Sequence, residues 1–211
     1  MSNSLRLTVL LLALVGVAVI PAGASAEVLT ASKGGTHQHA IISGAQTTTH
    51  EITAGAGFGA VSCSTATLSG TSSTGTDEEI EFDPTFSGCK DSLGRTIHIH
   101  ILKCKFKLRW GIPPFKISNC KFPFEITTTS GGSTVCTMSI PEQEGLSAVK
   151  YENMASDVTA IFEVTNLKST TSGGFFNCGI ANGEHTTGTY KGTTTFTGQN
   201  TSGEALSLKV E

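Results

Sequence analysis

The stretch TIHIHILKCKFKLRWGIPPFKISNCKFPFEI, residues 96–126, decides the fold because its side chains alternate in character. One parity is apolar and contains Cys104, Phe106, Leu108 and Trp110. The other parity is cationic and contains Lys103, Lys105, Lys107 and Arg109. Successive side chains of a β-strand point to opposite faces, so the pattern predicts an amphipathic strand with one buried side.

A second strand is expected directly after it, with Cys120, Phe122, Phe124 and Ile126 on its apolar face. Residues 111–114, Gly-Ile-Pro-Pro, supply the turn between the two, because proline fixes φ and cannot continue a ladder. Pairing Cys104 with Cys120 places Phe122 opposite Leu102. The same pairing places Phe124 opposite His100. Pro123 lacks an N–H group and predicts an edge position for this strand.

The apolar parity changes within the stretch. The β-branched residues Ile97, Ile99 and Ile101 are odd-numbered, whereas the apolar residues from Cys104 onward are even-numbered. Because a shift of one residue moves the buried set to the other face, we expect a bulge, a sharp bend or a change of sheet near residues 102–104.

The N-terminus has the pattern of a secretory signal. Arg6 precedes an apolar run over residues 7–20, and the small residues of 24–26 form a cleavage site. The run is shorter than the ~20 residues that a membrane span needs, so we expect cleavage before Glu27 and no span afterwards. We expect residues 1–26 to be a signal peptide and 27–46 an irregular arm. Residues 47–211 are then a single all-β domain.

Strand-like segments recur along the rest of the chain with turn residues between them. They cover residues 47–54, 61–68, 79–82, 135–140, 145–151, 157–167, 186–197 and 205–210. No amphipathic helix of good length interrupts them. This spacing is typical of an all-β sandwich, and a partly open barrel is the alternative.

The chain has 24 glycines and only 15% charged residues, which predicts a thin core. Disulfides compensate for a thin core in exported proteins. Six cysteines allow fifteen pairings, and we expect the sequential set. The expected bridges are Cys63–Cys89, Cys104–Cys120 and Cys136–Cys178. None of the cysteines forms a CxxC pair, so zinc-ribbon and thioredoxin-like interpretations have little support.

Several segments are familiar in combination: residues 83–89 (DPTFSGC), 136–146 (CTMSIPEQEGL), 173–178 (GGFFNC) and 188–192 (GTYKG). Over residues 61–211 the chain resembles a family of secreted, cysteine-stapled β-proteins that is common in actinobacteria. The shared motifs are cysteines and turns. That family has no assigned function, so the resemblance implies a fold and a compartment but no catalytic residue.

The hairpin is also the candidate binding surface. Its cations are about half of the positive charge that remains after the signal, on a chain of net charge −3. Trp110 and Phe115 at the turn could stack on sugar rings, beside Lys105, Lys107 and Arg109. The alternative is an ordinary amphipathic hairpin with solvated lysines. The expected partners are cell-wall polysaccharide or an envelope protein, and the acidic balance argues against nucleic acid.

Two clusters suggest metals. His98 and His100 leave the same strand face and could bind zinc or copper, if His37, His39, His50 or His185 supplied further ligands. The acidic residues Asp77, Glu78, Glu79, Glu81 and Asp83 could hold calcium. Glu79 and Glu81 could also act as a glycosidase pair. Solvated strand faces are the simpler explanation of both clusters, and we expect no bound metal.

Catalytic signatures are missing from the sequence. It has no G-x-S-x-G elbow, no P-loop and no dinucleotide fingerprint, and disulfides would consume the thiols. We therefore expect no cofactor and no enzymatic activity. The sequence predicts a secreted, extracellular or envelope-associated binding or structural module, with an extracellular hydrolase as the competing hypothesis.

Overall fold

The computed structural model describes residues 27–55, 60–101, 103–110, 115–120, 124–130, 133–146, 149–173, 178 and 181–211. In chain order its strands are β1 (Leu29–Lys33), β2 (Thr36–His37), β3 (Ala40–Thr53), β4 (Val61–Ser72), β5 (Thr76–Asp77), β6 (Glu79–Lys90), β7 (Thr96–His100), β8 (Lys105–Arg109), β9 (Phe115–Ser118), β10 (Phe124–Ser130), β11 (Ser133–Ile140), β12 (Gln143–Leu146), β13 (Val149–Asn153), β14 (Val158–Ser172), β15 (Gly183–Gln199) and β16 (Ala205–Val210). The expected signal segment and the turn at residues 111–114 lie outside the described residues.

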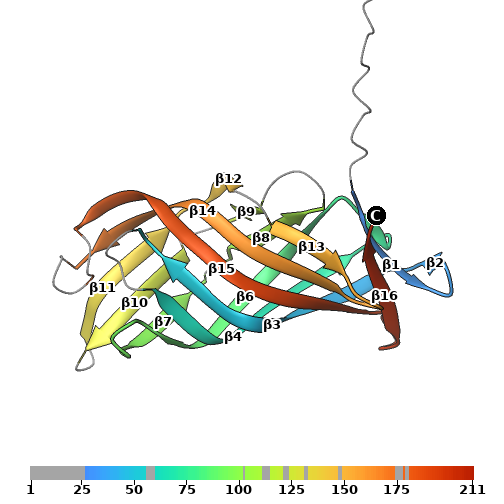
Figure 1. Cartoon of the computed structure of the whole chain (residues 1–211), viewed down its shortest axis with the longest axis horizontal. Helices are drawn as coiled ribbons and strands as arrows, with labels where there is room; N and C mark the ends of the chain where they lie inside the picture. The colour runs from blue at the N-terminus through green and yellow to red at the C-terminus, as the bar shows by residue number, and fades with distance from the viewer. Residues whose placement is uncertain are drawn as a thin grey trace, which may run out of the picture.

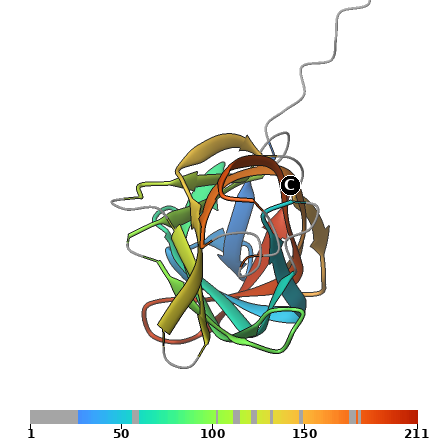
Figure 2. The ribbon, with the colours of Figure 1, turned by 90° about the vertical axis from the view of Figure 1, so that its left-hand side faces the viewer.

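The strands form a closed antiparallel barrel with eight walls (Figures 1 and 2). The walls follow one another in chain order: β3, β4, β6, β7 with β8, β9 with β10, β11 with β12 and β13, β14, and β15. The last wall, β15, pairs with the first, β3, from Thr189↔Thr53 to Gln199↔Ile41. The sandwich prediction is therefore wrong and the barrel alternative is the correct one.

Three walls are built from strands that continue each other after a break. Strand β6 pairs first with β8, from Glu79↔Arg109 to Phe82↔Phe106, and then with β7, at Cys89↔Ile97. The break between β7 and β8 contains Lys103, whose φ is +62°. The parity change in the sequence thus marks a real interruption, as predicted.

The same break recurs in the neighbouring wall. Asn119, after β9, has φ +55°, and β10 begins only at Phe124. The Cys104–Cys120 disulfide joins the two broken walls at this level. The other two bridges are Cys63–Cys89 and Cys136–Cys178, so the sequential pairing is confirmed. The expected contact between Leu102 and Phe122 lies outside the described residues. The edge prediction for the second strand is wrong, because β10 pairs with β7 on one side and with β11 on the other. The expected register is also wrong by one residue, because His100 lies opposite Glu125 and not Phe124.

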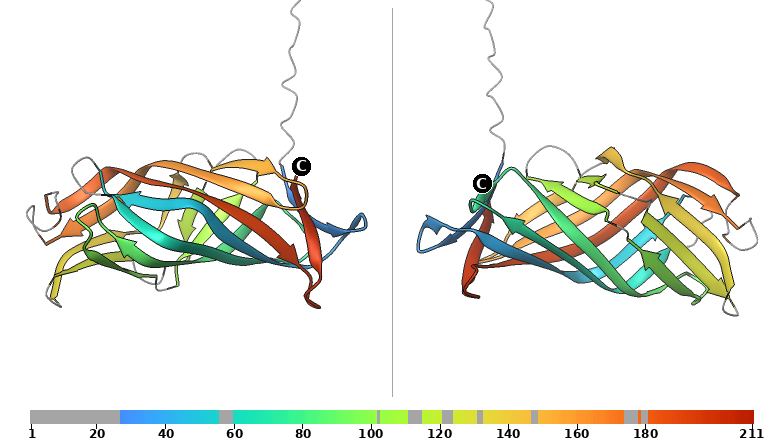
Figure 3. Two further views of the ribbon diagram at one scale, coloured as in Figure 1. Left: turned by 60° about the horizontal axis from the view of Figure 1, so that its bottom comes forward. Right: turned by 180° about the vertical axis from the view of Figure 1, so that it is seen from behind.

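Strands β1 and β16 close one end of the barrel (Figures 1 and 3). After a turn, β16 leaves β15 and pairs antiparallel with β1, from Leu29↔Val210 to Ser32↔Ser207. Leu29 and Leu208 are buried in this ribbon. Residues 27–46, expected to be irregular, instead contain β1, β2 and the first half of β3.

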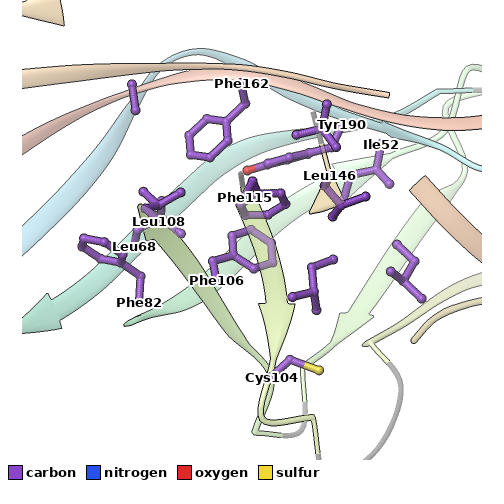
Figure 4. Close-up of a cluster of buried hydrophobic side chains, with 14 of the residues drawn as sticks. Ile52, Leu68, Phe82, Cys104, Phe106, Leu108, Phe115, Leu146, Phe162 and Tyr190 are labelled. Atoms are coloured by element: carbon purple, nitrogen blue, oxygen red, sulfur yellow. The ribbon is translucent and has the colours of Figure 1, made fainter. Parts of the chain in front are cut away.

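The interior of the barrel is mostly apolar and is packed with side chains. Aromatic side chains from several walls meet at its centre (Figure 4). Phe106 and Phe115 meet edge to face with centroids 4.9 Å apart, and Phe162 lies 5.2 Å from Tyr190. The apolar cavity beside Phe106, Phe115 and Tyr190 measures only about 10 Å³. A barrel of eight strands is just wide enough for such side chains to fill it.

Candidate functional site

The predicted binding hairpin forms part of the barrel wall as β8 and β9. Strand β8 alternates as expected, with Phe106 and Leu108 pointing inward and buried. Lys105, Lys107 and Arg109 point outward. The face assignment made from the sequence is therefore correct, although both strands are much shorter than the predicted ones.

The two aromatic residues of the predicted tip lie inside the barrel. Trp110 and Phe115 are 1% and 2% exposed. The Trp110 ring packs on Tyr151 with centroids 4.6 Å apart, and the Phe115 ring stacks on Tyr190 with centroids 5.9 Å apart and an interplanar angle of 27°. Neither ring is available to stack on a sugar. The hairpin pairs with β6 on one side and β12 on the other, which turns its apolar face inward.

The cations of β8 are neutralised by the acidic cluster of β6. Lys107 Nζ lies 3.0 Å from Glu79 Oε1 and 3.2 Å from Glu81 Oε1. Hydrogen bonds to these carboxylates raise the pKa of Lys107. Lys105 pairs with Asp83, and Arg109 lies 3.8 Å from Glu78. The basic surface and the acidic cluster, treated as separate candidate sites, are the two halves of one ion-pair ladder.

The histidines do not converge. His98 and His100 lie exposed on the outer face of β7, where their cross-strand neighbours are Thr127 and Glu125. His50 is buried inside the barrel, and His185 hydrogen-bonds with Thr171. Among the residues that the structure describes, no group of three His, Cys, Asp or Glu side chains is placed to hold a metal ion.

A buried polar cluster inside the barrel escaped the sequence analysis. His50 Nδ1 lies 2.6 Å from the Tyr190 hydroxyl, and its Nε2 lies 3.1 Å from Thr194 Oγ1 and 3.3 Å from the Thr193 carbonyl. Burial lowers the pKa of His50 and raises that of Tyr190. We therefore assign a neutral imidazole whose Nδ1 accepts from Tyr190. The sequence does contain a signal for this burial, because His50 has the same parity as the apolar residues Ile52 and Ala54 and so shares their strand face.

The outer wall has the opposite character and is rich in hydroxyls. The registers align one row of outward residues across five neighbouring strands: Thr85, Thr67, Ala45, Thr195 and Thr159. Thr67 hydrogen-bonds with Thr85, and Thr159 lies 3.2 Å from Thr195 between Oγ1 atoms. The wall therefore presents a neutral polar surface.

Charges on this wall form a balanced cross-strand row. Lys191 lies between Glu51 and Glu163 in the registers of β3, β15 and β14. Lys150 Nζ lies 2.7 Å from Glu163 Oε2. This ion pair raises the pKa of Lys150 and lowers that of Glu163. Alternating signs leave little net field along the row.

Among the described residues, a hollow in the outer wall lies at the turn between β15 and β16. It measures about 240 Å³. Its lining consists of Ser43, Thr197, Gly198, Gln199, Gly203 and Ala205. All of these residues are uncharged, so the hollow offers hydroxyl, carboxamide and backbone groups to a ligand.

Comparisons with known protein families, with curated proteins and with solved structures found no match. The resemblance to secreted, cysteine-stapled β-proteins therefore stays a prediction. A search of the described residues found no helix with the length and apolar character to cross a membrane.

Proposed function

We propose that the protein is a secreted binding module that attaches to envelope polysaccharide through the outer wall of its barrel. The observation that carries the proposal is the contrast between an interior packed with side chains and an outer wall that is rich in hydroxyls and whose charges are paired. The cavity described among the core aromatic residues, about 10 Å³, is too small for a carried ligand, which favours the exterior as the recognition surface.

The three disulfides support the proposed location outside the cytosol. Three bridges with no free cysteine among the described residues are consistent with an oxidising environment outside the cytosol. A secreted module also has to stay folded without cytosolic chaperones. Each bridge links different segments of the wall, which suits a rigid, durable scaffold.

The character of the partner follows from the charges. Because Lys105, Lys107 and Arg109 already have carboxylate partners, ionic attraction to an acidic polymer has little support. Hydroxyl and carboxamide groups donate and accept hydrogen bonds, which suits the hydroxyl groups of a neutral polysaccharide. We therefore favour polysaccharide over a charged protein surface.

The competing function, an extracellular hydrolase, has weaker support. General acid–base and nucleophilic catalysis both need groups within reach of a substrate. The His50–Tyr190 pair is fully buried. Glu79 and Glu81, the suggested glycosidase pair, share the ammonium group of Lys107.

Retention on an envelope fraction tests the proposal. The oxidised protein is incubated with envelopes that are untreated, digested with protease, or oxidised with periodate, which cleaves vicinal diols. We expect retention on the first two and loss on the third. Retention should persist in about 1 M NaCl, where charge interactions are screened within ~3 Å. Loss after protease digestion or in salt would identify a protein or ionic partner and overturn the proposal.

A further inference from the structure

The hollow on the outer wall lies at the turn that joins β15 to β16. Strand β16 pairs with β15 only at Gly198↔Leu206 and Gln199↔Ala205. It then crosses to β1, while β15 continues its pairing with β3. The 240 Å³ hollow lies beside this turn, where Gln199, Gly203 and Ala205 adjoin Ser43 and Thr197 of the β3–β15 ladder.

The geometry of the hollow is fixed by the residues around it. Gly198 is buried, and a Cβ there would lie 2.7 Å from Leu208 Cδ2, so glycine permits the close approach of β16. The following turn is held by Asn200, whose Oδ1 accepts hydrogen bonds from the N–H groups of Ser202 (3.1 Å) and Glu204 (2.9 Å). The hollow is therefore preorganised in the free protein.

Its polar groups are available to a ligand. Within the described part of the chain, the side chains of Ser43 and Gln199 make no hydrogen bond, and both are exposed. Thr197 Oγ1 donates to the Ser43 carbonyl at 3.3 Å, which leaves its lone pairs free to accept. Ile41, directly opposite Gln199 in the register, is 36% exposed and adds an aliphatic surface at the rim.

Charge is nearly cancelled beside the hollow. Glu204 lies between two lining residues, but Lys33 Nζ is 2.7 Å from its Oε1 and Asn200 donates to its Oε2 at 2.9 Å. These partners lower the pKa of Glu204. A ligand therefore meets paired charge at the rim and uncharged groups in the hollow, and a neutral molecule fits best.

We infer that this hollow binds one uncharged, pyranose-sized unit of a polysaccharide. The volume lies below the roughly 300–1,000 Å³ of pockets for drug-sized ligands, which limits the occupant to about a single ring. Gln199 and the hydroxyls of Ser43 and Thr197 hydrogen-bond the sugar hydroxyls, and Ile41 contacts a C–H face. The inference rests on the proposed function, because it assigns the site through which the module attaches.

Nuclear magnetic resonance titration of the full-length oxidised protein tests the site directly. The probes are neutral hexasaccharides of glucose, mannose and galactose. We expect one of them to shift the backbone amide signals of Gly198 and Gly203. Glycine amides elsewhere, such as that of Gly94 in the loop before β7, should not move. Shifts confined to other walls, or no shifts with any probe, would overturn the inference.

Matched substitutions inside and outside the hollow test whether the hollow is the site through which the protein binds. Ala205→Trp fills the hollow and should reduce envelope retention at least tenfold, whereas Ala181→Trp, exposed on the loop before β15, should not change it. Gln199→Ala should weaken binding about fivefold through one lost hydrogen bond, with Ser87→Ala as the neutral control. Thermal melts verify that each variant folds.

The outcomes distinguish the two proposals. If wild type is retained and Ala205→Trp is retained equally, the hollow is not the site, although the proposed function stands. If wild type is not retained on any envelope fraction, both proposals fail.

Discussion

The side chain of Gln143 takes the place of a missing strand beside Lys168. Gln143 Nε2 donates to the Lys168 carbonyl at 3.0 Å, and the Lys168 N–H donates to Gln143 Oε1 at 2.9 Å. The β11–β14 ladder stops at Ser139↔Thr170, and the β13–β14 ladder starts only at Val149↔Phe162. A buried carboxamide thus imitates a backbone peptide group and closes the wall between the two ladders.

Gln143→Ala should therefore destabilise the protein by about 2 kcal/mol, because it leaves the partly buried backbone N–H and carbonyl groups of Lys168 without partners. Urea unfolding of the oxidised protein measures this loss. Gln199→Ala, an exposed position, is the control and should change the free energy of unfolding by less than about 0.5 kcal/mol. Equal stability of the two variants would show that the carboxamide does not close the wall.

Trp110 should behave as a core residue and not as a surface anchor. It is the chain's single tryptophan, so intrinsic fluorescence reports on it alone. We expect blue-shifted emission that acrylamide quenches poorly until the protein unfolds. Trp110→Ala should cost about 3–5 kcal/mol of stability. Strong quenching of the native protein would place the indole ring in solvent and contradict the packing on Tyr151.

His50 should make stability depend on pH. Its folded-state pKa is lowered, chiefly by burial, against an opposing hydrogen bond to the Thr193 carbonyl. Between the folded-state pKa and the unfolded value of about 6.5, the unfolded chain binds more protons. This contribution is therefore complete above about pH 6.5 and decreases as the pH falls towards the folded-state pKa.

Chemical unfolding of wild type and His50→Gln at pH 7.5, 6.5 and 5.5 measures the effect. The variant should be less stable overall but should lose less stability between the first and last of these pH values. His98→Gln, at an exposed position, should follow wild type. A pH dependence that His50→Gln leaves unchanged would assign the acid sensitivity to other groups.

The three disulfides should contribute in the order of the loops they close. The sequence separations are 16 residues for Cys104–Cys120, 26 for Cys63–Cys89 and 42 for Cys136–Cys178. Loop-closure entropy predicts losses of about 3 kcal/mol for the shortest and about 4 kcal/mol for the longest. Paired Cys→Ala variants, unfolded in urea, give the order. A reversed order would show that native-state contacts outweigh loop entropy.

Local features of the fold could be predicted from the sequence because they depend on neighbouring residues. The alternation of Phe106 and Leu108 with Lys105 and Lys107 fixes the two faces of β8 wherever that strand lies. The parity change after Ile101 likewise predicts a break without any knowledge of the partners. The disulfide pairing follows the chain order because successive walls of the barrel are neighbours in space.

Partners distant in the chain could not be predicted in the same way. Alternation shows that Thr53 and Thr189 lie on strands, but not that these strands pair and close a barrel. The prediction of a free cationic binding surface on the hairpin was wrong for the same reason. Lys107 looked like a free cation because nothing in the local sequence sets the register that places it beside Glu79 and Glu81.

The pairing of β3 with β15 also determines when the barrel can close during synthesis of the chain. Thr53 cannot meet Thr189 until the ribosome has added a further 136 residues, the last of which is Thr189. Before β15 pairs with β3, the incomplete barrel has strand edges whose backbone N–H and C=O groups are unpaired. Contacts between segments that are distant in the chain also form slowly. This late closure is compatible with the export proposed above, because a chain that has not yet closed its barrel can cross a secretion channel unfolded and fold on the far side.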